Sequence, residues 1–394
     1  MNDGKLVFAQ LVAYLPEPKF RRLVSKYRGN ARIRTFSCWD QLLCMLFAQL
    51  TYRESLRDIE TCLRALSTKL YHMGIRGTVS RTNLARANEA RDYRIYEEFA
   101  LHLIKSARKL YANDSFDCEL KNTAYVFDST TIDLCLSLFP WAHFMEGNGG
   151  KTKGAIKLHT LLDLRGNIPT FIHISDGKMY DSCALDYLQI EPLAFYIMDR
   201  GYHDFRRLYK IEEARAFFVT RPRVNTQYRR LYSSAADKAQ GIHCDQIITL
   251  TGKDTSTFYP KSLRRIRFRD PATKKRLTFI TNNFDLPATT IAKLYKSRWQ
   301  VELFFKWIKQ HLRIKRFYGT TDNAVKTQIW IAISTYVLIA IVKKKLSLAP
   351  SLHTILQFLS VSAFEKNIIS TVFSDNQILN QIDYSRNQLS LFDC

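Results

Sequence analysis

Two short apolar runs, each followed directly by an aspartate, place the strongest constraint on how this chain can fold. Residues 124–127 (Ala-Tyr-Val-Phe) precede Asp128, and residues 194–198 (Ala-Phe-Tyr-Ile-Met) precede Asp199. Unbroken apolar runs of this length are typical of strands buried on both faces of a sheet. We therefore expect two core strands that each end in a carboxylate, although an aspartate after a strand is more commonly a turn residue.

A third carboxylate, Glu302, lies in a basic segment. On one continuous helix at about 100° per residue, Tyr295, Arg298, Glu302 and Lys309 would lie within roughly 60° of one another. Such a stripe offers one acidic group among cations to a polyanion. The alternative is a solvated basic face on which Glu302 pairs with a lysine at helical spacing. Further cations on or near the stripe are Lys306, Arg313 and Arg316.

The three carboxylates together suit a metal site better than any one of them alone. Asp128, Asp199 and Glu302 supply the oxygen ligands that Mg²⁺ or Mn²⁺ prefers. Two such ions about 4 Å apart can activate an attacking oxygen and stabilise the leaving oxygen in a displacement at phosphorus, and no histidine base is needed. We therefore predict Asp128, Asp199 and Glu302 as catalytic metal ligands for two ions.

The motifs around these residues resemble a known family. Asp128-Ser129-Thr130, Asp199-Arg200-Gly201-Tyr202 and Tyr295-x2-Arg298-x3-Glu302-x6-Lys309 together resemble the DDE transposases of bacterial insertion sequences, in the branch with the Y-R-E-K signature. The resemblance spans about residues 123–328. It implies an RNase H-like core, Mg²⁺-dependent cleavage at transposon ends, strand transfer into target DNA, and a homodimer in the complex that pairs two ends.

The cations of the signature segment are expected to bind DNA. Tyr295, Arg298 and Lys309 would hold the phosphates that flank the scissile bond, with Lys306 and Arg313 beside them. The whole chain carries 59 Lys and Arg against 36 Asp and Glu, a net charge of +23, which favours a polyanionic partner such as double-stranded DNA. Residues 253–316 hold 17 basic and 4 acidic residues, so 17 − 4 = +13 of that charge lies there.

Two other functions fit the same residues. An RNase H-like nuclease would cut DNA without joining it, and a regulator derived from a transposase would bind DNA without cutting it. Strand transfer with a donor that carries paired ends separates the three.

The pattern changes along the chain predict an α+β and α/β fold. We expect a helical DNA-binding domain at 1–118, in which Ser80 caps a helix-turn-helix-like helix bearing Arg81, Arg86, Arg91 and Arg94; a purely structural helical domain is the alternative. An RNase H-like catalytic domain at 119–345 follows, with a mixed sheet that begins in a three-stranded meander. A C-terminal helical region and flexible tail occupy 346–394.

A β-rich insertion is expected at about 222–282, because the sequence between Asp199 and Glu302 is longer than one helix and one strand require. Strand-like pieces fall at 246–250, 256–259, 264–269 and 276–281. Relatives with this insertion use an aromatic residue there to hold a flipped base while a DNA hairpin forms. The insertion has no tryptophan, and the residues that could stack a base instead are Tyr228, Tyr232, Phe258, Tyr259 and Phe268.

Three remaining features bear on location and partners. The 8 cysteines are scattered without a C-x-x-C pair, which predicts reduced cytoplasmic thiols. The apolar run at 329–342 is too short to span a bilayer and predicts a buried helix, so no membrane partner is expected. Residues 388–392, with Gln388, Leu391 and Phe392, resemble the motif by which bacterial DNA enzymes dock on the replication sliding clamp.

Overall fold

A computed structural model describes residues 4–116, 118, 120–145, 152–311 and 317–374. The chain divides into two compact units. Unit 1 comprises Met1–Tyr111 and Lys306–Cys394, and unit 2 comprises Ala112–Phe305. The catalytic domain was expected to extend to residue 345, whereas the structure groups residues from 306 onwards with the N-terminal helices. Residues 375–394, which contain the clamp-like motif, lie outside the described residues.

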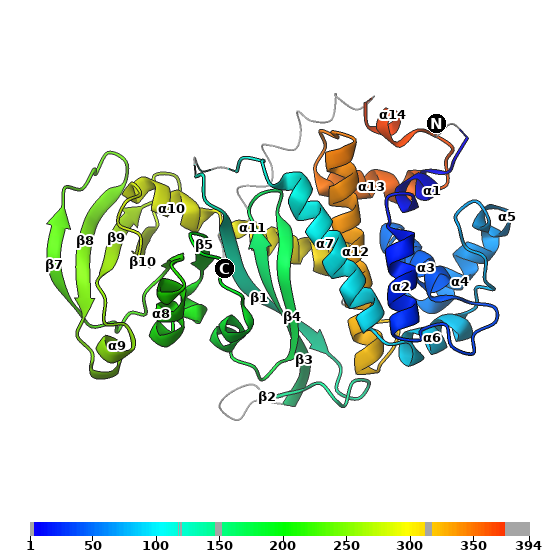
Figure 1. The fold of residues 1–394 in the computed structure, drawn as a ribbon, viewed down its shortest axis with the longest axis horizontal. Coiled ribbons are helices and arrows are strands. Elements are labelled where there is room, and N and C mark those ends of the chain that lie inside the picture. Colours follow the sequence, from blue (N-terminus) through cyan, green and yellow to red (C-terminus); the bar gives the residue numbers. More distant parts are fainter. Residues whose placement is uncertain (1–3, 117, 119, 146–151, 312–316, 375–394) are drawn as a thin grey trace. The chain divides into compact units, whose positions relative to one another are not determined.

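Unit 1 is built from helices in its described residues (Figure 1). Its core helix is α12, whose side chains are buried without a break from Thr327 to Val342. Helices α3, α6, α7 and α13 pack against it. The helices of this unit are α1 (Val7–Val12), α2 (Glu17–Lys26), α3 (Cys38–Leu50), α4 (Leu56–Ala65), α5 (Ser67–Leu70), α6 (Arg81–Ala90), α7 (Arg94–Tyr111), the π-helix η3 (Trp307–His311), α12 (Asp322–Lys345), α13 (Leu352–Ser362) and α14 (Ile369–Ser374).

Helix α12 contains the apolar run expected to form a buried helix, and that prediction is confirmed. Of the described helices, α12 is long and apolar enough to cross a membrane, but 94% of its most apolar window is buried inside the protein. Its start is fixed by Thr321, whose hydroxyl accepts a hydrogen bond from Ala324 N at 3.2 Å. A helix that is apolar all round is stable in water only when other helices enclose it.

Unit 2 contains one mixed sheet in the order β2-β3-β1-β5-β6-β10-β9-β8-β7, with β4 paired to β3 (Figure 1). Strand β1 is antiparallel to β3 and parallel to β5, and β5 is parallel to β6. The strands are β1 (Ala124–Leu134), β2 (His143–Met145), β3 (Thr152–Asp163), β4 (Ile168–Asp176), β5 (Phe195–Met198), β6 (Phe217–Thr220), β7 (Tyr228–Ser234), β8 (Ile242–Leu250), β9 (Leu263–Arg269) and β10 (Arg276–Thr281). The helices are the 3-10 helices η1 (Asp181–Tyr187) and η2 (Arg200–Tyr202), with α8 (Phe205–Glu213), α9 (Lys253–Phe258), α10 (Ala288–Lys296) and α11 (Trp299–Lys306).

Both aspartate-terminated runs form the expected core strands. Residues 124–127 of β1 and all of β5 are buried, and they pair in parallel from Ala124 with Phe195 to Phe127 with Met198. The meander β1-β3-β4 and the strands near 264–269 and 276–281 also lie where the apolar patterns predicted them. The strands of the predicted insertion extend the same sheet, because β10 pairs with β6.

Two local predictions were wrong. Residues 256–259 were expected to be a strand but end helix α9, in which Ser256 and Thr257 donate to carbonyls four residues earlier. The single helix expected through residues 295–309 is divided into α10, α11 and η3. Between α10 and α11, Arg298 N and Gln300 N bond to carbonyls three residues earlier, which tightens the backbone.

Candidate active site

The parallel pairing of β1 and β5 brings the two aspartates to neighbouring strand ends. Phe127 pairs with Met198, and Asp128 and Asp199 each follow one residue later. Asp128 Oδ1 accepts a hydrogen bond from Ser129 N at 2.8 Å. Asp199 Oδ1 accepts one from Gly201 N, and a Cβ at position 201 would lie 2.9 Å from that oxygen. The glycine in Asp199-Arg200-Gly201-Tyr202 therefore lets the Asp199 carboxylate take this orientation.

The Arg298 guanidinium joins two of the three predicted carboxylates. Its Nη1 donates to Asp128 Oδ2 at 2.8 Å, and its Nη2 donates to Glu302 Oε1. The Arg298 and Asp128 side chains are only 21% and 17% exposed, so solvent screens this pair weakly. The structure thus brings Asp128 and Glu302 together around one cation, and Arg298 and Glu302 keep their helical i, i+4 relation.

Burial and charge shift the pKa values of these groups in opposite directions. Burial raises the pKa of Asp128 to about 6, Arg298 and the Ser129 amide oppose the rise, and the charges of Asp199 and Glu302 add to it. Burial alone would lower the pKa of Arg298, but Glu302 and Asp128 raise it overall. Like charges nearby raise the pKa of a carboxyl group, and Asp199 and Glu302 both act on Asp128 in this way.

A second network beside Asp128 was missed from the sequence. Ser129 Oγ donates to Asp181 Oδ1 at 2.8 Å, and Lys157 Nζ donates to the same oxygen at 3.1 Å. Lys157 lies on β3 opposite Thr131, and Asp181 begins η1. The three residues are far apart in the sequence: the pairing of β1 with β3 brings Ser129 and Lys157 together, and Asp181 reaches them from η1.

The remaining signature residues are found in different surroundings. Tyr295 is buried, with its ring 4.7 Å from that of Phe279, and burial raises its pKa. Lys306 is exposed and Lys309 is half-buried, and both belong to unit 1. Arg313 lies outside the described residues.

The three predicted metal ligands are all carboxylates, but they are not arranged around a common point as the ligands of a metal ion would be. Within residues that the structure describes, no group of three or more His, Cys, Asp or Glu side chains is placed to hold an ion. Between Asp128 and Glu302, the Arg298 guanidinium provides the positive charge. All three side chains nevertheless offer the carboxylate oxygens that Mg²⁺ and Mn²⁺ take. The donor set therefore fits such an ion, with Arg298 as its present counter-charge.

Two histidines near the strand ends, His159 and His203, are buried. His159 is fully buried, with Nε2 2.9 Å from Ser175 Oγ, and burial lowers its pKa to about 4. Burial likewise lowers the pKa of His203 to about 4. With these pKa values, both imidazoles are neutral near pH 7.

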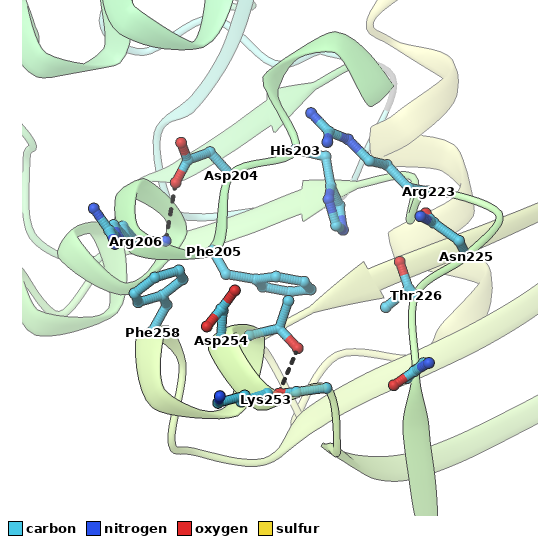
Figure 2. A pocket seen from close by; sticks show the side chains of 13 residues that line it. His203, Asp204, Phe205, Arg206, Arg223, Asn225, Thr226, Lys253, Asp254 and Phe258 are labelled. Carbon is cyan, nitrogen blue, oxygen red and sulfur yellow. Dashed lines mark hydrogen bonds between the residues drawn. The ribbon is translucent and has the colours of Figure 1, made fainter.

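The aromatic residues considered for base stacking differ in access. Tyr228 and Tyr232 are exposed, whereas Tyr259 is buried in the core and Phe268 contacts Phe279. Phe258 lines a hollow of about 520 Å³ beside α8 and α9, and Figure 2 shows its ring next to the Arg206 side chain. The Arg206 guanidinium lies 3.8 Å from the ring centroid, so one face of Phe258 is already covered.

The arginines expected on one N-terminal helix are divided by the structure. Ser80 caps α6 as predicted, by accepting from Asn83 N, and Arg81 and Arg86 on that helix are exposed. Arg91 is buried and donates to the Phe36 and Ser37 carbonyls. Arg94 begins α7 and pairs with Asp92 at 2.5 Å. Of these four arginines, only Arg81 and Arg86 are exposed on α6 and so suited to bind a partner molecule.

Comparison with known proteins identifies the family. Residues 119–338 match the family of the transposase DDE domain, and residues 3–76 match a domain of unknown function (DUF4372). The protein y4zB of Sinorhizobium fredii, described as a candidate transposase, is 37% identical over 220 residues, which are 55% of this chain and 60% of that protein. A protein of Geobacillus stearothermophilus, described as a probable transposase for insertion sequence element IS5377, is 31% identical over 220 residues, 54% of this chain and 55% of that protein.

Two further similarities are weaker. A protein of Synechocystis sp., described as a candidate transposase for insertion sequence element IS4SA, is 24% identical over 285 residues, 71% of this chain and 76% of that protein. The cryo-EM structure of the piggyBac transposase synaptic complex with hairpin DNA aligns with 92% of this chain and 78% of that chain, at a TM-score of 0.45 and 10% identity, and we conclude nothing from it. The chain spans less than two thirds of the first two relatives. Because the matched domain covers residues 119–338 of 394, this chain belongs to the transposase DDE domain family.

Proposed function

We propose that this chain is a DNA transposase that cleaves at the ends of an insertion sequence and joins them to target DNA. The proposal is carried by two observations within the transposase DDE domain: Asp128 and Asp199 follow neighbouring parallel strands, and Arg298 bonds to both Asp128 and Glu302. We place the chain in the Y-R-E-K branch on the spacing of Tyr295, Arg298, Glu302 and Lys309. An RNase H-like core is supported by the order of the meander, the parallel strand β5, helix α8 and strand β6.

Asp128, Asp199 and Glu302 would hold two Mg²⁺ or Mn²⁺ ions, as divalent ions are the general cofactors of this family. When bound, the ions would lower the pKa of an attacking water and stabilise charge on the leaving oxygen. The protein orients the carboxylates through the Ser129 and Gly201 amides. Arg298, released from Asp128 and Glu302, would face the DNA phosphates, and Tyr295, Lys306 and Lys309 are kept in the DNA-binding set on the spacing of the signature. Arg313 is retained in this DNA-binding set from the sequence alone.

A strand-transfer assay tests the proposal. Purified protein, a DNA donor with two element ends, a target plasmid and Mg²⁺ should yield joined products. Cleavage without joining would show a nuclease, and binding without cleavage would show a regulator. The flanking DNA gives a second check, because an insertion sequence is bounded by inverted repeats and short direct repeats.

Mg²⁺ should stabilise the protein more at pH 7 than at pH 5. Burial raises the pKa of Asp128 from 3.8 to about 6, so without metal the stability contributed by this group is complete below pH 4 and is lost as the pH rises through 6. Metal binding needs the ionised carboxylate, so bound Mg²⁺ offsets that loss only at the higher pH. Thermal unfolding with and without Mg²⁺ at both pH values measures this. An equal shift at pH 5 and pH 7, or the same pH dependence in Asp128→Asn, would contradict it.

We propose that the helical residues 1–118 bind element ends through α6. The support is the Ser80-capped helix with exposed Arg81 and Arg86. The double variant R81A/R86A should reduce the slope of log affinity against log salt for end DNA by about two, at about 0.9 per phosphate contact. Arg94→Ala is the matched control, because Arg94 already pairs with Asp92. An unchanged slope in the double variant would favour the purely structural helical domain.

The remaining partners are proposed on the resemblance. A homodimer would bring two element ends together, and residues 388–392 would dock on the sliding clamp through Gln388, Leu391 and Phe392. A cytoplasmic location is proposed because the substrate is DNA.

A further inference from the structure

The outer half of β9 carries three arginines on one face of the sheet. Side chains alternate between faces along a strand, so Arg265, Arg267 and Arg269 lie on the same face. Across the β9-β10 pairing, Arg276 lies directly opposite Arg269. Arg267, Arg269 and Arg276 are exposed and Arg265 is half-buried. We call these four residues the arginine face.

The described residues of β8, β9 and β10 place no carboxylate on the arginine face. The strand registers show which described residues share this side of β8, β9 and β10, and none of them is acidic. On β8, Gln246 lies opposite Arg265, and Cys244 lies opposite Arg267. Asp245 points to the opposite side, where it pairs with Arg264 at 2.7 Å. Asp270 follows Arg269 in the turn and accepts from the Ala272 amide at 2.9 Å.

The register makes this arrangement costly for the protein alone. Like charges directly opposite each other in an antiparallel pair destabilise the sheet, and Arg269 and Arg276 are such a pair. Arg265 is held outward by Gln246 Oε1 at 3.0 Å and lies over the Tyr228 ring, 5.0 Å from its centroid. A surface that keeps several uncompensated guanidiniums together is suited to an anionic partner with many charges.

We propose that the arginine face binds the sugar-phosphate backbone of duplex DNA outside the catalytic centre. Alternate residues of a strand are about 6.7 Å apart, twice the 3.4 Å rise per nucleotide of one DNA strand, so successive guanidiniums can follow one backbone. Arginine binds phosphate bidentately, and the exposed Tyr228 ring completes the edge of the surface. The inference rests on the proposed function in taking DNA as the polyanion. It assigns the strands beyond β6 a role in holding DNA.

The test compares two triple variants of the full chain. R267Q/R269Q/R276Q removes three charges from the arginine face, and R229Q/K238Q/K253Q removes three exposed charges from the same segment but from outside that face. Binding to a 30-bp duplex of scrambled sequence is titrated against salt. The first variant should lower the salt slope by about three, at about 0.9 per contact, and the second by less than one. Equal losses in both would overturn the proposal.

A single substitution separates binding from folding. Arg276→Glu places a carboxylate opposite Arg269, so its melting temperature should equal or exceed that of the unaltered protein while its DNA affinity falls. Unweakened DNA binding by R276E would overturn the proposal. It would also be overturned if sedimentation showed that the arginine face joins two copies of the chain and that DNA does not compete with this association. Absence of cleavage by the unaltered protein would refute the proposed transposase activity but would leave these binding results interpretable.

Discussion

Asp128→Asn, Asp199→Asn and Glu302→Gln should each abolish Mg²⁺-dependent cleavage while leaving DNA binding in place. Each change removes one negative charge at nearly constant shape, from Asp128 or Glu302, which bond to Arg298, or from Asp199, which follows the neighbouring strand. The expected loss in cleavage rate is about 100- to 1000-fold or more, the scale seen when a single group that stabilises transition-state charge is removed. Nicking of an end-containing duplex and gel-shift binding, run on the same preparations, measure the two effects.

The matched control is Asp186→Asn. Asp186 is a carboxylate of the same unit that pairs with Arg207 at 2.6 Å and Lys210 at 2.8 Å, away from the Arg298 cluster. It should keep its cleavage activity. If any of the three site variants nicks DNA at the full rate, that residue does not belong to the catalytic set.

Asp245→Ala should destabilise the protein by about 3–5 kcal/mol, the cost of leaving one charge of a buried pair without its partner. Asp245 and Arg264 are only 11% and 10% exposed, and Arg264 also donates to the Phe284 and Leu286 carbonyls. The pair joins β8 to β9, so its loss should loosen both strands. Urea denaturation gives the total effect, and hydrogen exchange in peptides from β8 and β9 locates it.

Two further variants test whether burial of the Asp245 and Arg264 charges causes the destabilisation expected in Asp245→Ala. Glu60→Ala breaks an i, i+4 pair whose arginine is 75% exposed, and should change stability by less than about 1 kcal/mol. The double variant D245L/R264L replaces both charges with apolar groups and should recover much of the stability lost in Asp245→Ala. A single variant as stable as the unaltered protein would show that the pair is screened by water.

The features predictable from the sequence were those that depend on neighbouring residues. The apolar runs before Asp128 and Asp199 predicted buried strands, because burial on both faces requires continuous apolar side chains. Ser80 predicted a helix start by its capping chemistry. The DDE family followed from short motifs whose residues were individually weak signals and were specific only in combination.

The features that escaped prediction depend on contacts between distant residues. The Ser129, Asp181 and Lys157 network needs the pairing of β1 with β3, and the break at Arg298 accompanies its bond to Asp128, 170 residues away. Helical periodicity alone favoured one straight helix there. The arginine face likewise needs the register of β9 against β10, since the same arginines could have faced opposite sides after a one-residue shift.

The division of unit 1 into two segments has a consequence for synthesis on the ribosome. Helix α7 packs on α12, and Tyr111 donates to the Ala340 carbonyl 229 residues later. At 5–20 residues per second, the intervening chain takes on the order of 10–50 s to be made. Unit 2 can fold during that interval, but the apolar sides of α3 and α7 must wait for α12. We therefore expect the nascent chain to depend on a chaperone that shields these helices until α12 has been made. Glu302, the last of the three carboxylates, is synthesised only shortly before α12.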